Sequence, residues 1–207
     1  METAVKLMGE ARESFMVLMK TDLPSLWGYW RLYQGLFGDE RDVALMNRSA
    51  KFCFSVFQAT LMRSLISGIN RITDKAIYKN RKRLSLDRLL KFLDSTADKT
   101  AKEDLQKKFK AIGTTCEDLR LIRDELDAHR DEPRALGKAS TPLPSVSYAV
   151  IEKVLADISA FMNEFAKACG EDVVNYAGTT IPIDGGPRAL LRLLEIAEEH
   201  RPRTILD

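Results

Sequence analysis

The sequence predicts an all-α protein, on two observations. Apolar residues recur at steps of three and four through most of the 207 residues, which is the spacing of one helix face. No segment of useful length alternates apolar and polar residues as a half-buried strand does. Since the chain also lacks a repeat period and low-complexity segments, we expect a helical bundle rather than a sheet or a repeat array.

Two helices are predicted before residue 39. The first carries its apolar residues over Val5–Met19 and should end before Pro24. The second spans residues 25–37 and is closed by Gly38. Its aromatic stripe is more typical of a core or a dimer interface than of a base-stacking surface. The stripe consists of Trp27, Trp30 and Tyr33.

A long helix is predicted over residues 39–73, with a break near Asn47. Its apolar residues are too numerous for one narrow face, which is typical of the central helix of a bundle. A polar loop follows over residues 75–83, and Ser85 is expected to cap a short helix. The apolar face of that helix consists of Leu86, Leu89, Leu90 and Leu93.

Another helix is predicted over residues 98–130, with Gly113 and Thr114 as its weak point. The clearest interruption of the chain follows at residues 131–144, which we expect to be a loop. The residues that indicate this loop are Pro133, Gly137, Pro142 and Pro144.

Two more helices are predicted after that loop. One begins at Ser145 or Ser147 and ends at Gly170. Residues 172–186 mix apolar and turn residues and are expected to be irregular or to form a short extended arm. The last helix spans residues 187–200, since proline fits the first turn of a helix.

The charge balance excludes protein classes that depend on a strong overall charge. A total of 32 Lys and Arg against 30 Asp and Glu leaves a formal net charge of +2, so any anion binding must be local. The N-terminus carries acidic residues where a secretion signal is basic and then apolar, and no apolar run has the length of a membrane span. We therefore expect a cytoplasmic protein with no membrane partner.

Cysteine and histidine usage argues against disulfides, metals and cofactors. Cys53, Cys116 and Cys169 are an odd number and lie far apart. The two histidines are His129 and His200, and none of these five residues has a second ligand at metal-site spacing. The nucleophile-elbow, dinucleotide-binding and P-loop motifs are absent as well. The sequence thus predicts neither a metal nor a cofactor.

The end of the helix predicted over residues 98–130 is the best candidate for chemistry. Residues 121–131 concentrate charged side chains and contain one of the two histidines. The stretch RDELDAHR, from Arg123 to Arg130, resembles the Arg-x(4 to 6)-His motif of the HEPN superfamily of helical bundles.

An ordered set of further segments makes the resemblance more specific. The apolar helix ends in NRITD at residues 70–74, a basic loop and a short leucine-rich helix follow, and AHRD comes at residues 128–131. This order is similar to the abortive-infection (AbiU-like) branch of the superfamily. The resemblance covers residues 50–131. It implies a single HEPN-like helical domain over residues 1–207, with additional flanking helices and a C-terminal extension over residues 171–207.

The resemblance implies metal-independent cleavage of RNA in a cleft between two subunits. With the motif carried over, His129 is the general acid or base and Arg123 contacts the phosphate and the transition state. Cleavage requires that the RNA 2′-hydroxyl lose a proton, that the 5′-oxygen gain one, and that charge on the phosphorane be stabilised. An imidazole and a forked guanidinium meet these needs. The expected partners are RNA, a second copy of the chain, and a cognate inhibitor or antitoxin protein.

The spacing of the motif raises a geometric question. Six residues place Arg123 and His129 about 120° apart around an ideal helix and about 9 Å apart along it, so they do not share a face. A single site therefore requires that the arginine reach around the helix, that the helix end unwind, or that a partner subunit supply the other residue.

The chain departs from the family pattern in two places. The position after the motif arginine is often a neutral amide, whereas here it is Asp124, which joins Arg123 and His129 as a candidate catalytic residue. Its charge would repel phosphate and could raise the pKa of a nearby imidazole. Some HEPN toxins carry a modified tyrosine shortly after the histidine, whereas here Arg130 and Asp131 follow. Nothing in the sequence supports that mode of regulation.

A second group of candidates supports the motif: Asn70, Arg71 and Asp74, with Arg130 beside the histidine. In the family's bundle, the helix over residues 39–73 packs beside the motif helix. Asp74 is then placed to orient the motif arginine or histidine. The alternative is an i, i+3 ion pair between Arg71 and Asp74 with a structural purpose only.

The densest basic cluster is a candidate RNA-binding segment. It comprises Lys79, Arg81, Lys82 and Arg83, with Lys75 and Tyr78 close by. An exposed basic loop without a binding role is the alternative.

Two other functions remain open. Asp124 favours a non-catalytic HEPN module that binds RNA, nucleotide or a partner protein. In a purely structural dimerisation domain, Arg123 would pair with Asp127 at i, i+4 on a solvated face, and His129 would be a helix-end cation favoured by the macrodipole.

Overall fold

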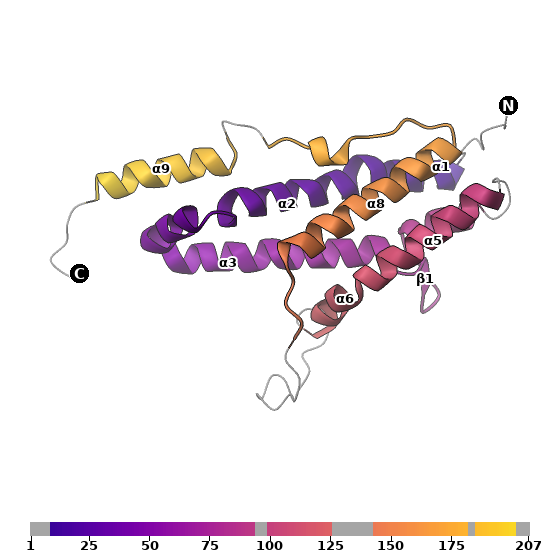
Figure 1. The fold of residues 1–207 in the computed structure, drawn as a ribbon, viewed down its shortest axis with the longest axis horizontal. Coiled ribbons are helices and arrows are strands. Elements are labelled where there is room, and N and C mark those ends of the chain that lie inside the picture. The colour runs from indigo at the N-terminus through magenta and orange to yellow at the C-terminus, as the bar shows by residue number, and fades with distance from the viewer. Residues whose placement is uncertain (1–8, 94–98, 126–142, 182–184, 202–207) are drawn as a thin grey trace. The chain divides into compact units, whose positions relative to one another are not determined.

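The computed structural model describes residues 9–93, 99–125, 143–181 and 185–201, and most of these residues are helical (Figure 1). The elements, in order, are α1 (Gly9–Val17), the π-helix η1 (Leu18–Asp22), α2 (Leu23–Phe37), α3 (Glu40–Thr73), β1 (Ile77–Tyr78), β2 (Arg81–Lys82), α4 (Leu86–Leu93), α5 (Lys99–Thr115), α6 (Glu117–Arg123), α8 (Tyr148–Ala168), the 3-10 helix η3 (Tyr176–Gly178) and α9 (Pro187–Glu199). Strands β1 and β2 form an antiparallel hairpin. The predicted all-α class is confirmed.

Helix α1 ends at Val17, before Pro24 as predicted, but the chain stays helical through η1 into α2. Val17 and Leu23, on either side of η1, keep right-handed helical angles, and the N–H of Leu23 donates to the carbonyl of Leu18, five residues earlier. Pro24 has no N–H to donate to the preceding turn. A π segment shifts the hydrogen-bond register just before the proline, so the helical path continues into α2.

Helix α2 carries the predicted aromatic stripe, and its side chains are buried. Trp27, Trp30 and Tyr33 are 2%, 0% and 7% exposed. The interpretation of the stripe as core is confirmed.

Helix α3 breaks at Ala50, three residues after the predicted position. Ala50 has φ −158° and ψ 63°, outside the helical region. The hydroxyl of the preceding Ser49 donates to the carbonyl of Leu45 at 3.0 Å. Such bonds compete with the backbone ladder and bend helices.

Burial changes along α3 after the break at Ala50. Just after the break, three apolar side chains are exposed, contrary to the core role expected for the whole helix; they are Phe52, Val56 and Phe57. Towards the end of the helix, four apolar side chains are at most 4% exposed, namely Leu65, Ile66, Ile69 and Ile72. Among the described helices, α3 is the one whose length and composition would allow it to cross a membrane.

Ser85 precedes α4 as predicted, but its hydroxyl does not form the expected cap. Its carbonyl accepts from the backbone N–H groups of Arg88 and Leu89. The hydroxyl is buried and has no hydrogen-bond partner among the described residues. The four predicted leucines of α4 are all buried.

The helix predicted over residues 98–130 is divided into α5 and α6 at Cys116, two residues beyond the predicted weak point. Helix α8 begins after Ser147, whose hydroxyl accepts from the N–H of Val150 at 3.3 Å. This is one of the two predicted starts. Most of the loop predicted at 131–144 lies outside the described residues.

Two compact units make up the described chain. The first contains the residues up to Trp27 and those from Ile66 to Gly178. The second contains Gly28–Leu65 and the residues from Thr179 onward. A single domain with a C-terminal extension stays a prediction.

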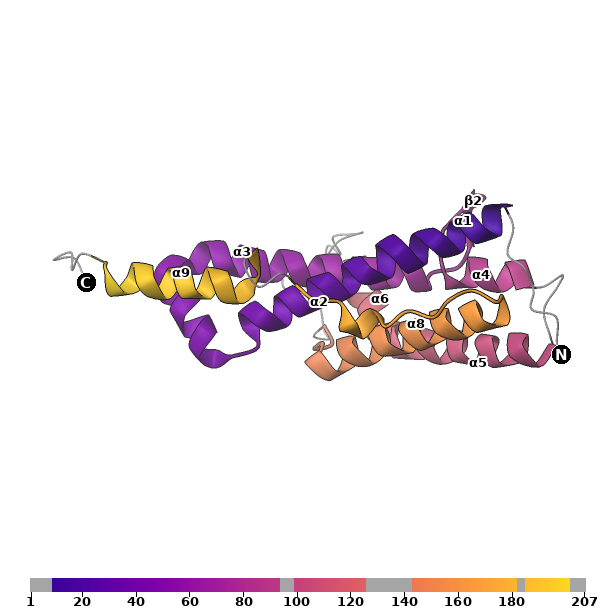
Figure 2. The same cartoon turned by 90° about the horizontal axis from the view of Figure 1, so that it is seen from above.

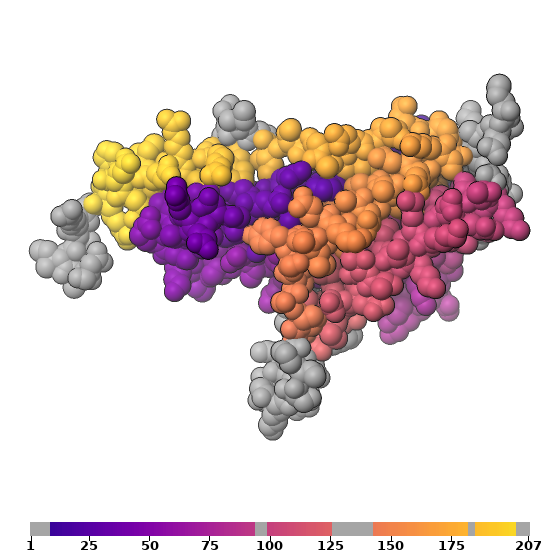
Figure 3. All heavy atoms as spheres, in the orientation of Figure 1, coloured from indigo at the N-terminus to yellow at the C-terminus, as the bar shows by residue number. Residues whose placement is uncertain are grey.

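The core of the first unit lies between α1, α5 and α8. Helix α5 lies beside α8 in both ribbon views, and the two are in contact in the space-filling view (Figures 1, 2 and 3). Phe165 of α8 faces Phe15 of α1 with 5.5 Å between ring centroids. Phe161 of α8 faces Phe109 of α5 at 6.5 Å.

The second unit joins parts of α2 and α3 to α9. A Cβ at Gly35 would lie 2.6 Å from the ring of Pro187, so only glycine permits this approach of α9. Arg188 of α9 donates to Asp42 of α3 at 3.0 Å. Helix α9 begins at Pro187 and ends beside His200, as predicted.

Candidate functional site

Arg123, the motif arginine, is the last residue of α6. Leu119 and Ile122 face the core and are 0% and 7% exposed. Residues at i and i+3 share a helix face, so Arg120 and Arg123 project together from the neighbouring side of α6. Both side chains line the same cavity.

Asn70 fixes α6 against the end of α3. This fully buried side chain donates from Nδ2 to the carbonyl of Ile66, at 2.9 Å, and to that of Leu119 in α6, at 3.0 Å. One turn further along each helix, four residues after Asn70 and Leu119, lie Asp74 and Arg123. These two form an ion pair, with 3.1 Å between Arg123 Nη1 and Asp74 Oδ2. The buried amide therefore sets the register that brings them together.

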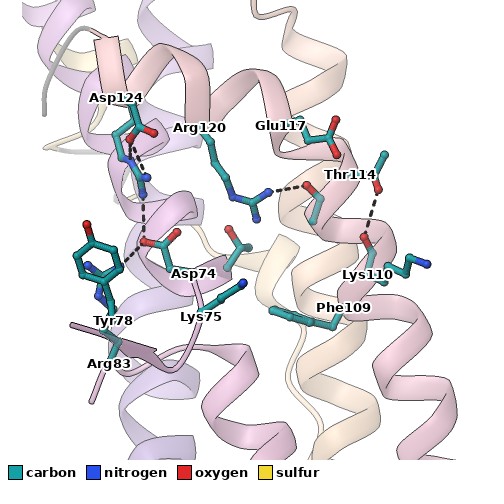
Figure 4. Close-up of a pocket in the computed structure, with 13 residues that line it drawn as sticks. Asp74, Lys75, Tyr78, Arg83, Phe109, Lys110, Thr114, Glu117, Arg120 and Asp124 are labelled. Atoms are coloured by element: carbon teal, nitrogen blue, oxygen red, sulfur yellow. Dashed lines mark hydrogen bonds and ion pairs between the residues drawn. The ribbon is translucent and has the colours of Figure 1, made fainter. Parts of the chain in front are cut away.

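Asp74 is shared by two arginines. Its Oδ2 accepts from Arg123 Nη1 at 3.1 Å and from Arg83 Nη1 at 2.9 Å (Figure 4). The Asp74 side chain is only 16% exposed, so both bonds are shielded from water. The contact with Arg123 is the one expected if Asp74 orients the motif arginine, and that role stays a prediction.

Asp124 holds the other side of Arg123. Its Oδ1 accepts from Arg123 Nε at 2.9 Å and lies 2.8 Å from Nη2. Burial opposes the charged form of Arg123, but the hydrogen bond to Asp124 and the charge of Asp74 outweigh that cost and raise the pKa of Arg123 above its ordinary value. Arg123 is thus permanently charged and fixed between two carboxylates.

A cavity of about 890 Å³ opens beside this cluster, between the hairpin, α5 and α6. Five basic and three acidic side chains line it, so local positive charge is in excess. Its lining comprises Thr73, Asp74, Lys75, Tyr78, Arg83, Phe109, Lys110, Gly113, Thr114, Glu117, Arg120, Arg123 and Asp124.

The five cations of the cavity differ in their pairing. Arg83 and Arg123 are paired with Asp74 and Asp124, as above. Arg120 donates from Nη1 to the carbonyl of Gly113 at 2.8 Å, and this acceptor carries no net charge. Among the described residues, neither Arg120 nor Lys75 nor Lys110 forms an ion pair.

The predicted basic loop is a hairpin, and only part of it faces the cavity. Its turn residues Lys79 and Asn80 both have positive φ, 46° and 62°, as a type I′ turn requires. Of the four predicted RNA-binding residues, Arg83 lines the cavity, whereas Arg81 and Lys82 belong to β2, and Lys82 pairs with Glu10 at 3.6 Å. Lys79 lies 5.3 Å from the centroid of the Tyr78 ring.

Arg71 does not pair with Asp74, because it pairs with Asp22 at 2.9 Å. It lines a neighbouring cavity of about 530 Å³. Asp74, Arg83 and Arg123 line both cavities and so form the wall between them.

His129 and Arg130 lie outside the described residues, as does Asp127. The position of the histidine relative to Arg123 therefore stays a prediction. Among the described residues, no group of three or more His, Cys, Asp or Glu side chains is placed to hold a metal ion.

Sequence reasoning missed three charged side chains of the cavity. Arg120 and Lys110 were not singled out, and Glu117 was not considered. The spacing of Arg120 three residues before Arg123 was the available signal for a shared face. Lys75 and Tyr78 were noted only as neighbours of the basic cluster.

Comparison with protein families gives one match. A family model described as AbiU2, within the HEPN group (HEPN_AbiU2), matches residues 13–176. The match includes Arg123, His129 and every residue that lines the cavity, and it ends before α9. No curated protein and no solved structure matches the chain.

Proposed function

The chain belongs to the AbiU2 family of HEPN proteins, and from this membership we propose that it is a metal-independent endoribonuclease of a bacterial antiphage or toxin type. The family makes it an abortive-infection HEPN module. Cleavage of RNA at the Arg123–His129 motif is the step that we add.

One observation carries the proposal: Arg123 lies on the wall of a cavity lined by four further cations. RNA is recognised first through its phosphates, and guanidinium and ammonium groups are the side chains that bind them. A fixed guanidinium stabilises charge that develops on a phosphate without having to reorganise during the reaction. Asp74 and Asp124 supply that fixation.

In the proposed reaction, Arg123 contacts the scissile phosphate and His129 transfers a proton as general acid or base. Asp74 and Asp124 are positioning residues, because they contact the guanidinium. Two copies of the chain are proposed to complete the site across a dimer cleft. The proposed setting is the bacterial cytoplasm, with a cognate inhibitor or antitoxin as a further partner.

The test is cleavage of single-stranded RNA by the purified full-length protein in EDTA. We expect products with 2′,3′-cyclic phosphate ends and no cleavage of DNA, since attack by the neighbouring 2′-hydroxyl requires neither metal nor water. His129→Ala and Arg123→Ala should each lower the rate by roughly 100-fold or more. Lys107→Ala is the control, because Lys107 is exposed on α5 and does not line the cavity. An unchanged rate in both motif variants would assign the activity to a contaminating nuclease.

A non-catalytic RNA-binding module is the second candidate, and the pairing of Arg123 with two carboxylates favours it. Those carboxylates reduce the attraction of Arg123 for an incoming phosphate. Intact RNA after long incubation, together with RNA binding that depends on Arg123, would select this function over the nuclease.

A further inference from the structure

The cavity beside Arg123 contains cations that form no ion pair with any described residue. Arg120 donates one N–H to the carbonyl of Gly113, which carries no net charge, and Lys75 forms no ion pair within the described part of the chain. Figure 4 shows both side chains reaching into the space between Asp74 and Phe109, Arg120 from α6 and Lys75 from the segment just after α3. Two cations that reach into one cavity and form no ion pair with a described carboxylate suit an anion with several acceptor oxygens.

The same cavity offers an aromatic surface. Tyr78 lines it and is 51% exposed. The guanidinium of Arg83 lies 4.4 Å from the centroid of its ring and supports it. Arg83 is in turn held by Asp74, and its backbone N–H donates to the carbonyl of Ala76 at 2.7 Å, so the ring sits on a fixed base. Exposed aromatic rings of this kind stack unpaired nucleobases.

The volume of the cavity, its cations and its exposed aromatic ring together indicate one class of ligand. A volume of about 890 Å³ lies within the range of small-molecule sites and exceeds what a lone phosphate requires. An acidic peptide would use the cations but would not require the ring. A nucleotide uses both, because it joins a phosphate to a flat base.

We infer that the cavity holds one nucleotide of single-stranded RNA, next to the nucleotide on which Arg123 acts. Lys75 and Arg120 bind its phosphate and Tyr78 stacks on its base. This subsite rests on the proposed function only in taking RNA, rather than a free nucleotide, as the source of the ligand.

The test measures binding of a short fluorescein-labelled 2′-O-methyl oligoadenylate, which lacks the attacking hydroxyl and therefore stays intact. Lys75→Ala, Arg120→Ala and Tyr78→Ala should each weaken binding by about tenfold or more. Tyr78→Phe keeps the ring and should bind more tightly than Tyr78→Ala. Lys107→Ala removes a charge outside the cavity and should bind as the wild type does. Lys75 is exposed and unpaired among the described residues, so its variant should fold even if Arg120→Ala does not.

Competition by AMP and by polyglutamate identifies the source of the ligand. AMP should compete with the same dependence on Lys75 and Tyr78, but more weakly than the oligonucleotide. Equal affinity for AMP would overturn the assignment to RNA, and equal competition by polyglutamate would overturn the assignment to a nucleotide. Wild-type binding by all three alanine variants would overturn the subsite itself.

The outcomes also separate this inference from the nuclease proposal. If cleavage of unmodified RNA depends on Arg123 but binding does not depend on Lys75, Arg120 and Tyr78, the subsite is wrong and the nuclease proposal holds. If these variants bind RNA more weakly but the protein cleaves no RNA, the subsite holds and the nuclease proposal is wrong.

Discussion

The two sides of the cavity carry the same kind of charge in opposite settings. On one side, Arg83 and Arg123 are held by Asp74 and Asp124 at 2.8 to 3.1 Å. On the other side, Lys75 and Arg120 form no ion pair with a carboxylate among the described residues. An arginine paired with a carboxylate is held in one geometry, but the carboxylate weakens its attraction for an anion. A cation without such a partner attracts an anion more strongly, but its side chain is less restricted.

The difference shows how a site can attract a polyanion and still act on one of its phosphates. Attraction needs uncompensated charge, and the unpaired side supplies it. Chemistry needs a donor at a defined place, and the paired side supplies that. Under the proposed function, the two sides therefore have separate tasks, and variants on each should fail in different ways.

Among the variants that compare the two sides, the largest effect is expected for Asp74, because two arginines lose an acceptor at once. Asp74→Ala should lower the free energy of unfolding by roughly 1–3 kcal/mol, the scale of hydrogen bonds to charged groups. RNA cleavage should fall by about tenfold or more, since Arg123 loses its position. Urea denaturation and cleavage assays measure the two quantities.

Asp74→Asn is the matched variant, since it keeps the shape and one oxygen acceptor but not the charge. It should lie between the wild type and Asp74→Ala in both measurements. An Asp74→Ala protein as stable and as active as the wild type would show that Arg83 and Arg123 do not depend on Asp74 for their positions.

A smaller effect, on the salt dependence of RNA binding, should distinguish the two sides. Each phosphate contact on a single strand contributes about 0.7 to the slope of log affinity against log salt concentration. Lys75→Ala should reduce the slope by about that amount. Arg83→Ala should change it less, because Asp74 already neutralises Arg83. Equal slopes for the two variants would contradict the division of the cavity.

The smallest effect is expected for Asp124, whose side chain is 53% exposed. Asp124→Asn removes a negative charge beside the phosphate but keeps an oxygen that accepts from Arg123. RNA binding should tighten by a few fold, since solvent screens a charge at this exposure. Weaker binding, measured by fluorescence anisotropy, would show that the carboxylate helps to position the ligand.

The paired side could largely be found from the sequence. Arg123 belongs to a local motif, and Asn70 and Asp74 stand out as polar residues at the end of an apolar helix. Asn70 and Asp74 contact residues of α6 that lie 49 positions later in the sequence. The buried Asn70 fixes this alignment of the two helices, and no local sequence pattern encodes it.

The unpaired side was harder to predict. Its geometry depends on the helix break at Cys116, which carries neither glycine nor proline. It depends also on the hairpin turn at Lys79 and Asn80, which lacks the glycine that usually marks such turns. The π segment before Pro24 was also not predicted, because a proline indicates the end of a helix more often than a change in the helical hydrogen-bond pattern.

The most direct test of the account is the single-turnover cleavage rate of Arg123→Lys at saturating RNA. Lysine keeps the charge, but it cannot contact two carboxylates and a phosphate with a planar fork. If the fixed geometry of Arg123 is what matters, Arg123→Lys should lose roughly 100-fold in rate, nearly as much as Arg123→Ala, while Lys107→Ala stays at the wild-type rate. A lysine variant that cleaves RNA as fast as the wild type would show that charge alone suffices and would contradict the account.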